Sequence, residues 1–157
     1  MILLPLLLQV TPVQPLPRAD LPPPPADEAA VLAPIERMFA GIAAKDGAQI
    51  LAQVRPGGHG TAVVERADGS KAVTTRGWAE FAANFKPGAG PAMEERTTGM
   101  PAIEIDGDMA MVWSNYVFLL DGKVAHCGVN HFSMVRDPGG WKVHTVTWTQ
   151  RTTGCTQ

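Results

Sequence analysis

His126 is the side chain whose type and position are best suited to chemistry. It lies in one of the long segments that make up the second half of the chain. Imidazole exchanges protons near neutral pH, so His126 is our candidate general base. The alternative, which we favour, is a buried histidine that bonds a neighbouring strand and holds Arg151 or a water molecule.

Carboxylates that could act as a base are scarce in the same region. Over residues 109–150 the chain has only two acids, and both fall in expected hairpin turns. Glu104 precedes this range, and Glu94 and Glu95 stand at the edge of a loop, so we expect all three at the surface. The long strands therefore offer no carboxylate base, which favours a binding pocket over a catalytic site.

Antiparallel strands are the elements that must position His126. Turns rich in Asp and Gly, a strong hairpin signal, separate segments expected as strands over 92–106, 109–120, 123–136 and 141–150. Strands of this length twist and curl strongly. Earlier in the chain, the patterns predict helices over 27–45, 46–54 and 76–86, and short strands over 60–66 and 71–75. This order predicts an α+β fold in which the helices close one face of a curved sheet.

Local signals set the ends of the earlier elements. Asp46 is expected to cap the second helix and Thr75 the third. Pro34 lies inside the first expected helix, so we expect a kink or a later start there. Pro56-Gly57-Gly58 is expected to break the chain before the first strand.

Two hairpin pairings, Leu119 with Val124 and Arg136 with Trp141, assign each strand residue to a face of the sheet. One face combines large apolar residues with a few polar ones, as small-molecule pockets do. We assign it to the interior, and its expected ligand-binding residues are Trp113, Asn115, His126, Asn130, Thr147 and Arg151. On this register His126 lies across from Arg151. The other face is expected to form a homodimer through Tyr116, Val129, Val146 and Trp148. A β-bulge would exchange the two sets locally.

These motifs resemble a known family. The segments that carry the resemblance are Val112-Trp113-Ser-Asn-Tyr116-Val-Phe118, Asp121-Gly122-Lys123, His126-Cys127-Gly128, Phe132, Gly140-Trp141-Lys142-Val143 and Thr149-x-Arg151. Residues 28–155 are similar to the SnoaL-like and lumazine-binding-like bacterial branch of the nuclear-transport-factor-two-like superfamily. The resemblance implies a cystatin-like cone, in which a curved antiparallel sheet holds three N-terminal helices in its concave face. Proteins of this kind are usually dimeric.

The superfamily includes isomerases, cyclases and dehydratases, so the fold alone does not assign the chemistry. Its isomerases and cyclases use an acidic base on the sheet, and this sequence departs from that pattern.

The first 26 of the 157 residues are set apart from the expected domain at 27–157. Residues 1–10 are nearly all apolar, a run too short to span a membrane but suited to a signal peptide. A disordered apolar tail is the alternative. Residues 11–26 contain seven prolines and are expected to form an extended linker. Export would place the protein in the periplasm or outside the cell.

The remaining composition limits the partners. The net charge is −2 and the basic residues are scattered, so nucleic acid is not an expected partner. The four histidines are dispersed and no acid is spaced to join them, so we expect neither a metal site nor a cofactor. Cys127 and Cys155 are expected to form a disulfide if the protein is exported, and the alternative is two unrelated thiols.

Three functions follow from these observations. The leading hypothesis is an exported, dimeric protein that binds a small and partly apolar molecule without catalysis. The second is a lyase, isomerase or hydrolase that uses His126 with Asn130 and Arg151. The third is an interaction module whose cone is filled by its own side chains.

Overall fold

The computed structural model describes residues 25–66, 68–88 and 90–155. The expected signal peptide and most of the expected linker therefore lie outside the described residues. The elements, in chain order, are α1 (Pro25–Ala44), α2 (Gly47–Leu51), β1 (Val54–Glu65), β2 (Lys71–Gly77), α3 (Trp78–Ala82), β3 (Met93–Asp106), β4 (Met109–Leu120), β5 (Lys123–Asp137) and β6 (Gly140–Gln150). Among the described residues, none of the three helices has the length and hydropathy of a membrane-spanning segment.

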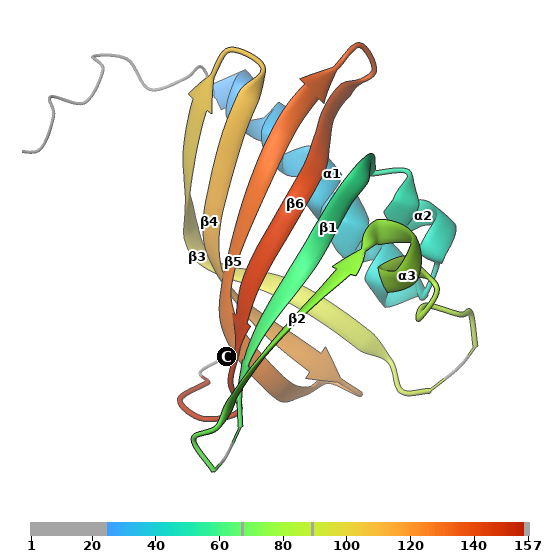
Figure 1. Ribbon diagram of the computed structural model, residues 1–157, viewed down its shortest axis with the longest axis vertical. Coiled ribbons are helices and arrows are strands. Elements are labelled where there is room, and N and C mark those ends of the chain that lie inside the picture. Colours follow the sequence, from blue (N-terminus) through green and yellow to red (C-terminus); the bar gives the residue numbers. More distant parts are fainter. Residues whose placement is uncertain (1–24, 67, 89, 156–157) are drawn as a thin grey trace, which may run out of the picture.

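The six strands form one curved sheet in the order β2-β1-β6-β5-β4-β3. Figure 1 shows α1 lying against one face of this sheet, with α2 and α3 beside β1. The α+β cone predicted from the sequence is therefore confirmed. One pairing differs from the expected antiparallel sheet, because β1 and β6 run parallel while the other four neighbouring pairs are antiparallel.

Helix α1 contributes the apolar face that covers the sheet. Val31, Ile35, Met38 and Ile42 recur at helical spacing and are all buried in the main core. Pro34 is buried as well, and the helix neither starts after it nor ends at it. A proline removes one backbone donor from a helix, and packing of the apolar face against the sheet offsets that loss here.

Asp46 caps α2 as predicted, since its Oδ1 accepts hydrogen bonds from the backbone N–H groups of Ala48 (2.9 Å) and Gln49 (3.0 Å). The prediction for α3 is wrong at both ends. Thr75 belongs to β2, where its hydroxyl lies 2.9 Å from that of Thr61 on β1, and the helix covers only Trp78–Ala82. Cross-strand pairing of Thr75 outweighs its tendency to cap a helix.

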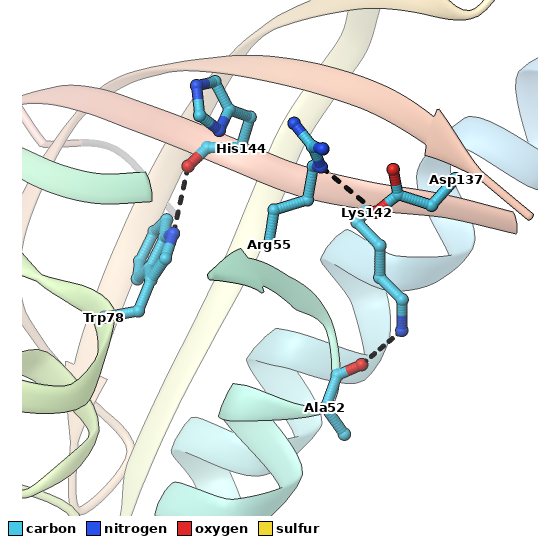
Figure 2. A network of polar contacts seen from close by, with 6 residues as sticks. All are labelled: Ala52, Arg55, Trp78, Asp137, Lys142 and His144. Atoms are coloured by element: carbon cyan, nitrogen blue, oxygen red, sulfur yellow. Dashed lines mark hydrogen bonds and ion pairs between the residues drawn. The ribbon is translucent and has the colours of Figure 1, made fainter. Parts of the chain in front are cut away.

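Strand β1 begins earlier than predicted, at Val54, and runs through the expected break at Gly58. A Cβ atom on Gly58 would lie 1.8 Å from the backbone oxygen of His144 on β6. The same oxygen accepts a hydrogen bond of 3.0 Å from Nε1 of Trp78 (Figure 2). Glycine therefore lets β1 pass close to β6 while Trp78 fixes the start of α3 against both strands.

Two further contacts in Figure 2 join the start of β1 and the end of α2 to the hairpin between β5 and β6. Arg55 at the start of β1 pairs with Asp137 at 3.0 Å between Nε and Oδ2. Nζ of Lys142 on β6 donates to the backbone oxygen of Ala52, just after α2. These contacts anchor the segment between α2 and β1 to the hairpin end of β5 and β6.

Candidate functional site

A cavity of about 180 Å³ lies between the helices and the inner face of the sheet. Its walls are mainly apolar and aromatic. They are formed by Met38, Ile42, Phe81, Phe85, Tyr116, Phe118, Phe132, Val146 and Trp148. Four polar side chains, Glu95, His126, Asn130 and Gln150, complete the lining. Apolar walls with a few converging polar groups are the usual composition of a small-molecule site.

Two β-bulges decide which residues reach this cavity. The predicted pairings of Leu119 with Val124 and of Arg136 with Trp141 are both confirmed. Beyond the first pair, however, Phe118 pairs with His126, so Ala125 is an extra residue on β5. On β6 His144 is extra in the same way, because Ser133 pairs with Thr145 and Met134 with Val143. Each bulge reverses the alternation on one side of it.

Four of the six predicted site residues consequently lie outside the cavity. Trp113 is 51% exposed and contacts the ring of His131 on the outer face of the sheet. Asn115 and Thr147 are exposed, and Arg151 is half-buried beside the backbone of Cys127 rather than opposite His126. Their assignment to the interior is wrong, because it assumed unbroken alternation from each hairpin turn.

The residues predicted for the outer face are also partly misassigned, for the same reason. Tyr116, Val146 and Trp148 were expected at a dimer contact, but all three line the cavity. Trp148 packs edge-on against Phe81 of the helical layer at 6.3 Å between ring centroids. Val129 remains on the outer face, where it pairs with the exposed Asn115.

His126 and Asn130 line the cavity as the sequence predicted, and their role in binding stays a prediction. His126 stacks on Phe118 at 4.7 Å between centroids, with the rings nearly parallel. Its Nδ1 lies 3.2 Å from the hydroxyl of Tyr116, and that hydroxyl donates to the backbone oxygen of Thr149 at 3.0 Å. Both contacts are satisfied when Nδ1 carries the proton, because Tyr116 has only one hydrogen to give.

This arrangement determines the chemistry available to His126. With the proton on Nδ1, the lone pair of the neutral ring is on Nε2, and no described residue donates to it. Burial lowers the pKa of His126, so the ring is mainly neutral at pH 7. Burial also raises the pKa of Tyr116, with a further contribution from the nearby Glu95, so its hydroxyl stays protonated.

Glu95 is a cavity-lining polar residue that the sequence reasoning missed. It was expected at the surface, but it lines the cavity from β3, and the side-chain amide of Asn130 donates to its Oε1 at 2.8 Å. Desolvation raises its pKa to about 7, although the Asn130 hydrogen bond acts in the opposite direction. The expectation that Glu95 lies at the surface is therefore wrong, and β3 places a carboxyl group in the cavity. A carboxyl group that titrates near neutrality can donate or accept a proton.

A signal for Glu95 is present in the sequence. Met93, Ile103 and Ile105 pack against the core, and Glu95 shares their odd-numbered positions. The irregularity of β3 between Thr98 and Ala102 shifts the register by two residues, which preserves the alternation. Counting back from the two isoleucines would have placed Glu95 on the inner face.

Cys127 and Cys155 form a disulfide, which confirms the predicted pairing. The bond holds the C-terminal segment after β6 against the outer side of β5, where Val117 and Leu119 complete a small second core. Within residues 25–155, apart from the two undescribed positions, no group of three His, Cys, Asp or Glu side chains is placed to hold a metal ion. The expectation of no cofactor stays a prediction.

Comparisons with known proteins agree with this geometry. A family model described as a SnoaL-like domain matches residues 58–147. No protein with a curated description matches the chain. Solved structures show the same fold at low identity.

Three of those structures illustrate the likeness. A nuclear-transport-factor-2-like protein with a cystatin-like fold from Novosphingobium aromaticivorans has a TM-score of 0.64 and 16% identity, over 83% of this chain and 85% of the other. A cystatin-like protein of unknown function from Nostoc punctiforme has a TM-score of 0.64 and 13% identity, over 82% and 94%. A candidate dehydratase from Streptomyces avermitilis has a TM-score of 0.61 and 16% identity, over 83% and 99%. These identities support the fold alone. The family model covers more than half of the chain, and the protein therefore belongs to the SnoaL-like domain family.

Proposed function

We propose that this protein binds a small, mostly apolar molecule in the cavity between the helices and the sheet. The observation that carries the proposal is the combination of nine apolar or aromatic wall residues with polar groups from β3, β5 and β6. A dry cavity of about 150 Å³ holds one benzene molecule. At about 180 Å³ this cavity suits a ligand with one ring and a small polar substituent.

Benzyl alcohol is a suitable first probe, because it has this size and one hydroxyl group. In an NMR titration, we expect the side-chain amide signals of Asn130 and Gln150 to move together and to saturate. Asn115 is the internal control, because it bears the same amide on the outer face. Shifts confined to Asn115, or no saturable shift at either inner amide, would contradict the proposal.

Catalysis by proton transfer is the second candidate, and Glu95 is the observation that favours it. A carboxyl with a pKa of about 7 and a neutral imidazole share one cavity, so a base and an acid are both available near neutral pH. This extends the earlier hypothesis of an isomerase, lyase or hydrolase based on His126.

Exchange of the hydrogens next to the carbonyl of cyclopentanone for deuterium tests this candidate without knowledge of the natural substrate. We expect exchange above the buffer rate, lost in Glu95→Gln and retained in Glu94→Gln. The control is matched, because Glu94 is the neighbouring glutamate and pairs with Arg96 on the outside. Exchange at the buffer rate, or equal exchange by both variants, would leave binding as the function.

We further propose that the protein is exported to the periplasm or the medium. The apolar run at residues 1–10 and the disulfide between Cys127 and Cys155 support this, because disulfides persist in oxidising compartments. Cell fractionation with N-terminal sequencing tests it. A mature form that lacks the apolar run is expected outside the cytoplasm, and an uncleaved cytoplasmic chain would refute it.

We also propose a homodimer through the outer face of the sheet. Trp113 and Met109 are 51% and 60% exposed on that face, which supports contact with a second copy. Light scattering of Trp113→Asp should give half the mass of the wild type. Val73→Asp, at an exposed apolar residue of the edge strand β2, is the control and should keep the full mass. An unchanged mass in Trp113→Asp would exclude this interface.

A further inference from the structure

The polar groups of the cavity offer lone pairs more readily than hydrogens. Tyr116 donates its hydroxyl hydrogen to Thr149, His126 directs its Nδ1 hydrogen at Tyr116, and Asn130 donates to Glu95. The ionised carboxyl of Glu95 and Nε2 of His126 are left as acceptors. Asn130 and Gln150 add amides that can act either way. A ligand that satisfies this set must bring donors of its own.

The charge of the cavity also favours a ligand that brings hydrogen-bond donors. Its titratable lining groups are Glu95, His126 and Tyr116, and no Lys or Arg is among the lining residues. His126 is mainly neutral at pH 7, and Tyr116 stays protonated. The cavity is therefore neutral or negative at and above neutral pH. No lining residue supplies the positive partner that carboxylates and phosphates need, and Arg151, whose charge acts on Tyr116, does not line the cavity.

Aromatic rings surround the acceptors. Phe81, Phe85, Phe118 and Trp148 line the cavity, and Phe81 contacts both Phe85 and Trp148. The faces of aromatic rings attract cations, and they also pack well against another ring. A carboxylate within aromatic walls is a suitable environment for an organic cation.

We propose that the ligand of this cavity is a small amine that is protonated at neutral pH, with its ammonium group bound to Glu95 and its apolar part against the aromatic walls. The proposal rests on the proposed binding function and names the ligand class for the same site. His126 Nε2 is the second acceptor available to the ammonium hydrogens.

Binding of an ammonium group must displace the proton of Glu95 wherever that carboxyl is protonated. Because the pKa of Glu95 is about 7, an amine competes with a proton below neutrality, and its affinity falls by about tenfold per pH unit there. An alcohol of the same size makes no such demand. Binding of the alcohol should therefore change little between pH 5 and pH 8.

Benzylamine, benzyl alcohol and benzoate form a matched series, with one ring and a cationic, a neutral or an anionic group. Calorimetry at pH 7.5 should show benzylamine binding at least about tenfold more tightly than benzyl alcohol, because hydrogen bonds to charged groups are the stronger kind. Benzoate should not bind. Glu95→Gln should abolish the preference for benzylamine, and Glu94→Gln should preserve it.

The outcomes separate the two proposals. If benzyl alcohol binds as tightly as benzylamine in the wild-type protein, the amine is refuted and the binding cavity stands. If none of the three probes binds or moves the signal of Asn130, the binding function itself is refuted. If Glu95→Gln does not fold, the pH dependence of benzylamine affinity in the wild-type protein tests the amine proposal instead. Affinity for benzylamine that does not fall between pH 7 and pH 5 would overturn the proposal.

Discussion

Replacing Glu95 by glutamine should change how stability depends on pH. Glutamine has nearly the same shape and keeps an oxygen that can accept the hydrogen bond from Asn130. What it removes is a proton that the folded chain holds more tightly than the unfolded chain does. The pKa of Glu95 rises from 4.5 to about 7 on folding, so between these two values the unfolded state is deprotonated while the folded state is not.

The sign and size of the effect follow from this difference. An acid whose pKa is raised by folding does not lower the free energy of unfolding below pH 4.5, because it is protonated in both the folded and the unfolded state there. Above pH 4.5 the destabilisation of the wild-type fold by Glu95 grows by about 1.4 kcal/mol per pH unit, and it levels off near pH 7 at about 3 kcal/mol. The free energy of unfolding of Glu95→Gln minus that of the wild type should therefore rise by about 3 kcal/mol from pH 4 to pH 8.

Urea denaturation of both proteins at half-unit pH intervals measures this difference directly. If the new amide also changes stability by a constant amount, the difference in free energy of unfolding shifts equally at every pH. Its rise between pH 4 and pH 8 stays the same. Glu94→Gln is the control and should show no such rise, because Glu94 is paired with Arg96 at the surface and its pKa is lowered rather than raised. A flat difference between wild type and Glu95→Gln would refute the placement of this carboxyl in a desolvated cavity.

Three further predictions follow from the same geometry. Replacing Cys127 and Cys155 together by alanine should lower the free energy of unfolding by about 3–4 kcal/mol in denaturation experiments, because the bond closes a loop with a sequence separation of 28. His126 should titrate below 6.5 in an NMR pH series, because burial disfavours its charged form, and the contribution of His126 to the free energy of unfolding should fall as the pH drops below 6.5; a pKa of 6.5 or above would contradict this. Gly128→Ala should destabilise the fold by about 1–3 kcal/mol, because the added Cβ would lie 1.8 Å from a backbone oxygen of β6. Gly139→Ala, where nothing lies within 4 Å of the added atom, should leave the melting temperature nearly unchanged.

The sequence predicted those features that depend on local signals. The turns at Asp121-Gly122 and 137–140 set both hairpin pairings correctly, and Asp46 caps α2 as expected. The cysteine pairing was also predicted. Each of these rests on residues with a strong intrinsic preference, such as a backbone with positive φ at Gly122 or a side chain that caps a helix.

The composition of the site could not be predicted in the same way. The bulges at Ala125 and His144 insert one residue each, and neither residue carries a distinctive signal, so the faces of β4 and of β6 beyond His144 were exchanged. Tyr116 and Trp148 were thereby placed outside and Trp113 inside. Register is determined by packing of whole strands against the helices, which no short segment encodes.

Proton transfer and amine binding in the cavity both depend on the desolvated carboxyl of Glu95, which NMR can titrate on its own. The carboxyl ¹³C signal of Glu95, assigned by its absence in Glu95→Gln, should titrate with a pKa of about 7 in the ligand-free protein. Titration near 4.5, together with the surface glutamates, would show that Glu95 faces solvent and that the cavity lacks the group on which the proposed amine binding depends.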